Sequence, residues 1–175
     1  MAHSTPEPQA LMFADDGWVP NNPTLPVLVY HDGVDIKGTA DPEKLIERTF
    51  VANGWGHNMW RNGIATYVHY HSMIHEAMGI ARGRVKLRIG GDKGQEVSLT
   101  AGDVVVLPAG TAHQQLSATS DLKVIGAYPP DGSYNLCRGA KFEHETALKT
   151  IPQVPVPDSD PVRGKTGPLL QLWPR

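Results

Sequence analysis

The chain has 175 residues, a formal net charge of −2 and one cysteine. This length is enough to bury the core of one domain, and the near-neutral charge argues against a nucleic-acid or anionic-membrane partner. A lone cysteine, Cys137, cannot form an intramolecular disulfide, which favours a reducing compartment. The first twenty residues carry prolines and acids where a signal peptide needs an apolar core. We therefore expect a cytoplasmic protein that does not span a membrane.

The first elements predicted along the chain are a short strand at 25–32 and a helix within 40–54. Asp41 can cap this helix, Pro42 suits its first turn, and Asn53-Gly54 can end it. From Ile64 the apolar pattern changes to a period of two, typical of β-structure. The predicted strands cover 64–71, 76–81, 84–90, 95–100, 103–108 and 122–128.

The 18 glycines and 15 prolines are spread along the chain as turn residues, so many short strands follow one another. This arrangement predicts an all-β sandwich or barrel. The basic residues of the strand at 84–90, namely Arg84, Lys86 and Arg88, alternate with apolar ones and should face solvent. The Pro-rich segment from Ile151 should be an extended tail whose apolar end packs on the body.

Three histidines and one glutamate lie between His69 and Glu76. On a strand, His69 and His71 would point to one face with a rise between them of roughly 6.6 to 7 Å. Glu76 lies at an odd offset, so it can join them only if the chain turns through 72–74 into a neighbouring antiparallel strand. His113 follows the turn at 108–110 and can return to the same place. Three imidazoles and a carboxylate suit a divalent transition metal.

The spacing of these residues resembles the two sequence motifs of the cupin superfamily. The first motif is matched by Gly63, His69-x-His71, Glu76 and Gly83, and the second by Gly102, Pro108-x-Gly110 and His113. Nine of the ten motif positions match; the tenth, usually Asn, is Ser117 here, and it is not a metal ligand in the family. The 18 residues between Gly83 and Gly102 can form two strands and a hairpin, as in compact bacterial cupins.

The resemblance implies a double-stranded β-helix, a jelly-roll barrel, with a short N-terminal helix and an extended C-terminal tail. It implies one domain over 1–175, with the barrel core at about 60–130, a strand-helix extension at 1–59 and a wrapping segment at 130–175. It also implies that His69, His71, Glu76 and His113 hold one Fe, Mn, Ni, Co or Zn ion. Four protein ligands would leave positions open for water, substrate or O2.

Other residues are weighed against this ligand set. By strand parity His75 points away from the metal, so a position behind the ligands or on the outer surface is favoured over metal binding. His75 and Glu76 are the candidates for moving a proton during catalysis. Tyr67 shares a face with the histidines and can either fill the core or line the pocket. Gln115 shares a face with His113 and can hydrogen-bond a ligand or a substrate. His57 lies in a loop that can reach the pocket mouth, although a position on the protein surface is favoured. Cys137 is expected to be inert.

The fold and metal ligands leave the reaction open. We favour an oxidoreductase of the dioxygenase type acting on a small polar organic molecule. One alternative is a metal-dependent isomerase. An isomerase of phosphorylated sugars would need basic residues at the barrel mouth, and the outward-facing Arg84, Lys86 and Arg88 weigh against it. The other is a non-catalytic small-molecule binding module. Cupins often pair through sheet edges, so we expect a homodimer.

Overall fold

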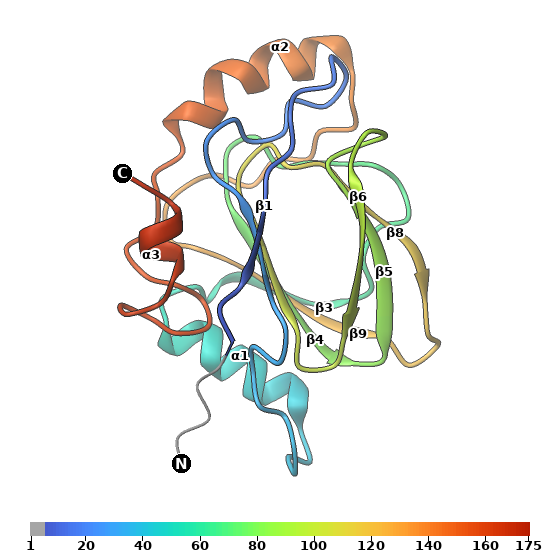
Figure 1. Cartoon of the computed structure of the whole chain (residues 1–175), viewed down its shortest axis with the longest axis vertical. Helices are drawn as coiled ribbons and strands as arrows, with labels where there is room; N and C mark the ends of the chain where they lie inside the picture. The colour runs from blue at the N-terminus through green and yellow to red at the C-terminus, as the bar shows by residue number, and fades with distance from the viewer. Residues whose placement is uncertain (1–5) are drawn as a thin grey trace.

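A computed structural model describes residues 6–175, which form two antiparallel sheets that face each other (Figure 1). The larger sheet has the order β1-β2-β7-β4-β9-β3 and the smaller has the order β6-β5-β8. In the order of the larger sheet, the strands are β1 (Gln9–Leu11), β2 (Val27–Tyr30), β7 (Val104–Leu107), β4 (Glu76–Arg82), β9 (Lys123–Tyr128) and β3 (His57–Asn62). The smaller sheet contains β6 (Gln95–Thr100), β5 (Arg84–Ile89) and β8 (His113–Ala118). The predicted all-β jelly roll is confirmed, as a pair of sheets that do not close into a continuous barrel.

Side chains alternate between two cores along the central strands of the larger sheet. On β7, Val104 and Val106 pack outward and Val105 and Leu107 pack between the sheets. On β4, Ala77 and Ala81 face outward. Met78 and Ile80 face inward, and Glu76 has the same parity. The period-two pattern therefore places the Glu76 side chain between the sheets and its neighbour His75 outside them.

Helix α1 (Pro42–Ala52) covers the outer face of the larger sheet, and the predicted N-terminal helix is confirmed. The carboxylate of Asp41 accepts a hydrogen bond from the Lys44 backbone N–H at 3.0 Å, as its capping role requires. The helix lies close to β4 at Gly79, where an added Cβ would come within 2.6 Å of Ile46. Glycine at this position thus permits the close approach of helix and sheet.

The C-terminal segment contains short helical elements that the sequence did not predict. It forms α2 (Lys141–Thr150), a 3₁₀ turn at Ile151–Gln153 and the short α3 (Leu169–Leu172). Within α2 only Ala147 is buried, so the helix has almost no apolar stripe that the sequence could reveal. The end of the tail does pack on the body as expected, because Leu169 and Trp173 are fully buried in the outer core.

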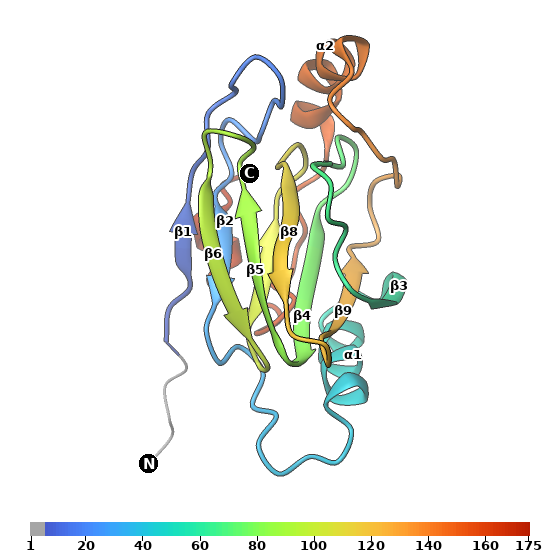
Figure 2. The same cartoon turned by 90° about the vertical axis from the view of Figure 1, so that its right-hand side faces the viewer.

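The segment at 64–71 is also not the predicted continuous strand. It makes only isolated bridges, from His69 to His113 and from Tyr70 to Cys137. The polar stretch before it, which reads as a loop, instead pairs with β9 as strand β3. Figure 2 shows β3 at the edge of the molecule beside β9. In both segments, pairing with a distant strand determines whether a strand forms. The local alternation of apolar and polar residues does not reveal this pairing.

The outer face of β5 agrees with the sequence analysis. Arg84 and Lys86 are exposed, Arg88 is partly exposed, and Lys86 and Arg88 approach Glu96 on the adjacent strand at 3.3 and 3.7 Å. Among residues 6–175, no helix has both the length and the apolar character needed to cross a bilayer.

Candidate metal centre

Three separate parts of the chain meet at the predicted ligand residues. Glu76 is the first residue of β4 and His113 the first of β8, while His69 and His71 lie on the segment that precedes β4. The predicted turn is present as a bend at Ser72 and Met73. Backbone hydrogen bonds exchanged between His69 and His113, at 3.2 and 2.9 Å, fix the two histidines side by side.

Each of the three histidines is oriented by a backbone carbonyl. The Nδ1 atom of His69 lies 3.1 Å from the Tyr67 oxygen, that of His113 lies 3.0 Å from the Thr111 oxygen, and that of His71 contacts the Asn135 oxygen. A carbonyl oxygen can only accept a hydrogen bond, so each Nδ1 carries the proton in the neutral ring. Each Nε2 therefore keeps its lone pair, which is the form that binds a metal.

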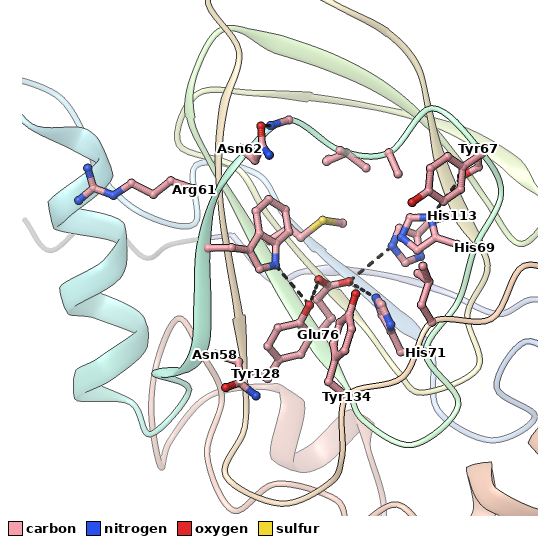
Figure 3. A pocket seen from close by; sticks show the side chains of 16 residues that line it. Asn58, Arg61, Asn62, Tyr67, His69, His71, Glu76, His113, Tyr128 and Tyr134 are labelled. Carbon is pink, nitrogen blue, oxygen red and sulfur yellow. Dashed lines mark hydrogen bonds and ion pairs between the residues drawn. The ribbon is translucent and has the colours of Figure 1, made fainter.

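The side chains of His69, His71 and His113 form a cluster suited to a metal ion, since one nitrogen of each lies within 4.8 Å of the others. The Oε2 atom of Glu76 lies 3.4 Å from Nε2 of His71 and 3.5 Å from Nε2 of His113. This oxygen is buried and receives no hydrogen bond. Figure 3 shows the glutamate and the three imidazoles converging on one point. Three nitrogen lone pairs and one unsatisfied carboxylate oxygen are a donor set that fits a divalent transition metal.

The electrostatics of the cluster favour a positive charge beside the glutamate. Burial alone would raise the pKa of Glu76, but the nearby imidazoles of His113 and His71 outweigh it and hold the pKa well below its usual value. Burial alone would lower the pKa of His71, yet the adjacent Glu76 carboxylate raises it. Burial, together with the neighbouring His113, lowers the pKa of His69 to about 3. A proton on His71 or a bound cation can supply the charge that the ionised Glu76 requires.

The cluster lies at one side of a cavity of about 680 Å³. Its wall is mostly aromatic and apolar, with two asparagines among the lining residues Asn58, Trp60, Asn62, Ile64, Tyr67, Met78, Tyr128, Tyr134 and Leu136. Arg61 also borders the cavity, but its guanidinium is paired with Glu47 and points toward α1 (Figure 3). A cavity of this size can hold a small organic molecule against the cluster.

The other predicted site residues are not all at the cavity. Tyr67 lines it and is 40% exposed, and its ring packs edge-on against His69. Gln115 is not part of the wall, although its buried Oε1 has no hydrogen-bond donor and lies near Gly63 at the cavity edge. His57 is exposed on β3, beside the lining residue Asn58.

The structure places His75 outside the cavity. It is fully buried, its Nδ1 accepts a hydrogen bond from the Ala109 backbone N–H at 2.9 Å, and its ring packs against Trp173. Strand parity correctly predicts that His75 points away from the cluster. The alternative position on the outer surface is wrong, because the side chain is fully buried. The C-terminal tail covers the position, and we propose no catalytic role for His75.

Sequence reasoning did not identify several residues that contact the ligand set, among them Tyr128 and Asn135. The Tyr128 hydroxyl donates to Oε1 of Glu76 at 2.8 Å, and the Asn135 carbonyl orients His71. Asn135 also binds Ser72 through its side-chain amide, which holds the loop after β9 against the segment at 69–72. The only sequence feature that could have identified Tyr128 is its position in the alternation of β9, which places its side chain on the face toward the cavity.

The facing sheets and the histidine cluster define a cupin. A family model described as the cupin domain matches residues 58–125, and the chain belongs to the cupin family. Over 167 residues the chain is 39% identical to the uncharacterized protein YjlB of Bacillus subtilis (strain 168), across 95% of this chain and 97% of that protein.

Two solved structures show low overall similarity to this chain. One is a sugar 3,4-ketoisomerase from Thermoanaerobacterium thermosaccharolyticum in complex with TDP, with 14% identity and a TM-score of 0.39 over 53% of this chain and 74% of that chain. Another is the acireductone dioxygenase of Bacillus anthracis with a cadmium ion in its active centre, with 16% identity and a TM-score of 0.38 over 58% and 76%.

Proposed function

We propose that the protein is a metal-dependent oxidoreductase of the dioxygenase type that acts on a small polar organic molecule. In this proposal His69, His71, Glu76 and His113 hold one divalent transition metal. The observation that carries it is the meeting of three Nε2 lone pairs and the unsatisfied Oε2 of Glu76 beside the cavity. A bound metal would supply Lewis acidity and exchangeable positions at which a substrate and O2 can be brought together.

The chain's own residues would bind and orient the substrate. The amides of Asn58 and Asn62 and the hydroxyl of Tyr67 offer hydrogen bonds on the cavity wall. Met78 and Leu136 offer apolar contacts, from which an entering substrate would displace water. This mixture of polar and apolar groups on the wall suits a small organic molecule that carries polar substituents.

An isomerase is the alternative reaction within the same site. It would need a base that is free to move a proton on the substrate. Among the described residues that line the cavity, Glu76 is the only carboxylate, and in our proposal it binds the metal. A phosphorylated sugar is further disfavoured because Arg61 is committed to Glu47 through two hydrogen bonds. These features favour the oxidoreductase.

The experiment that tests the reaction type uses nitric oxide as an O2 analogue. Anaerobic Fe(II)-loaded protein should give a high-spin iron–nitrosyl EPR signal, and oxygen uptake should rise with a substrate from a metabolite panel. His57→Ala, which alters an exposed residue outside the cavity wall, is the matched control and should keep the signal. If iron is bound but no nitrosyl signal forms, the dioxygenase proposal is wrong and the isomerase or the binding module takes its place.

The oligomeric state and the location remain predictions. We propose a cytoplasmic homodimer. Light scattering coupled to gel filtration should give twice the mass of one chain. A monomeric mass at micromolar concentration would contradict the dimer.

A further inference from the structure

A line of hydrogen bonds runs from the edge strand β3 to the carboxylate of Glu76. The indole Nε1 of Trp60 lies 3.3 Å from the hydroxyl oxygen of Tyr128, and this hydroxyl lies 2.8 Å from Oε1 of Glu76. An indole N–H can only donate, so the Tyr128 oxygen accepts from Trp60. An ionised carboxylate can only accept, so the single phenolic proton of Tyr128 goes to Glu76.

The backbone holds the first member of this line in place. Trp60 and Gly126 are direct cross-strand partners on β3 and β9. An added Cβ at Gly126 would lie 1.9 Å from the indole ring, so the ring lies directly over this glycine. Two residues further along β9, Tyr128 points into the same cavity. The position of the indole is thus decided by strand pairing and by the absence of a side chain at Gly126.

The line distinguishes the two oxygens of the carboxylate. Oε1 is held by a phenol, while Oε2 faces His71 and His113 without any hydrogen-bond donor (Figure 3). We infer that Tyr128, oriented by Trp60, is a positioning residue that makes Glu76 present one oxygen and not two to the metal. This inference rests on the proposed metal site. Its functional consequence is that the second carboxylate oxygen does not occupy a position that substrate or O2 would need.

The test compares two tyrosines that face the same cavity. Tyr128→Phe removes the hydroxyl bonded to Glu76. Tyr134→Phe removes a hydroxyl that makes no hydrogen bond within residues 6–175, although its ring packs on both His71 and Tyr128. Each variant is titrated with Co²⁺ and followed by its visible spectrum, and Fe(II)-loaded samples are compared by nitrosyl EPR.

The expected result is a loss of metal affinity of about 10- to 100-fold for Tyr128→Phe, the usual effect of removing a group that orients a ligand. Its cobalt spectrum and nitrosyl line shape should also change. Tyr134→Phe should bind Co²⁺ with the wild-type affinity and spectrum. Trp60→Phe keeps an aromatic ring over Gly126 but removes the N–H, and should weaken binding in the same direction by about two- to tenfold.

Two outcomes would overturn the inference, and both differ from failure of the metal site itself. The first is that Tyr128→Phe and Tyr134→Phe match the wild type in both affinity and spectrum. The second is that Tyr128→Phe fails to fold while Trp60→Phe binds cobalt as the wild type does, which would make Tyr128 a purely structural residue. If the wild-type protein binds no cobalt, the proposed metal site is wrong before the variants are compared.

Discussion

The C-terminal tail should contribute a large share of the stability through one residue, Trp173. Its side chain is fully buried in the outer core, its Nε1 donates to the Pro26 carbonyl at 2.8 Å, and its ring packs on His75. Replacing a buried Trp by Ala costs about 3 to 5 kcal/mol through lost apolar burial and the cavity left behind. The unsatisfied Pro26 carbonyl adds about 1 kcal/mol or more.

A loss of about 4 kcal/mol in a chain of this size corresponds to a fall in Tm of about 8 to 16 °C. Calorimetry and urea unfolding of the Trp173→Ala variant measure the change. The matched control is Trp18→Ala, because Trp18 also donates its indole N–H to a carbonyl, that of Gly139 at 3.0 Å, but is 38% exposed. The control should lose only about 1 to 2 kcal/mol. Equal losses for the two variants would refute the conclusion that the tail is docked by burial of Trp173.

Three further predictions concern the metal site, the acid limit of stability and the tail. Excess metal should raise the free energy of unfolding of the wild type by about 2.7 kcal/mol at one hundred times Kd, and the Tm should rise with it. His113→Ala should abolish most of this gain while the apo protein still folds; a gain that survives in the variant would exclude His113 from the ligands. Burial lowers the pKa of His69 to about 3 and that of His75 to about 4, so only the unfolded chain takes up these two protons as the pH drops from about 6.5 toward 4, and these two groups reduce apo stability over this range. His71, whose pKa Glu76 raises, acts in the opposite direction; the contribution of His75 is isolated by His75→Asn, which should lose less stability than the wild type between pH 6.5 and 4 in urea unfolding, and an equal loss would contradict it. Asp160 accepts hydrogen bonds from the Tyr30 hydroxyl at 2.6 Å and from the backbone N–H groups of Val162, Arg163 and Leu169. Asp160→Ala should destabilise the fold by about 3 kcal/mol or more, because two buried donors, the Tyr30 hydroxyl and the Leu169 N–H, and two part-buried ones lose their acceptor; a loss below 1 kcal/mol would show that water replaces it.

Local sequence was sufficient to predict the elements whose signals lie within a few residues. Asp41 and Pro42 mark the start of α1 because a helix leaves free N–H groups at its first turn. The alternation in β5 shows which side chains face solvent, since successive strand residues point to opposite faces. The spacing of the two motifs likewise indicated that His69, His71 and His113 come together, which the cluster confirms.

Contacts between distant segments decided the rest. The bond from Tyr128 to Glu76 joins residues 52 apart and that from Trp60 to Tyr128 joins residues 68 apart, so no local pattern reports them. The segment at 64–71 alternates like a strand, yet its pairing partners allow only two bridges. The parity of β4 set the side of His75, but only the folded tail shows that Trp173 buries it. The sequence by itself indicated which residues are candidate metal ligands, because side-chain chemistry is read directly from the sequence and the spacing matches the two cupin motifs. Only the tertiary structure decided how those ligands are oriented, because their hydrogen-bond partners arrive from other strands.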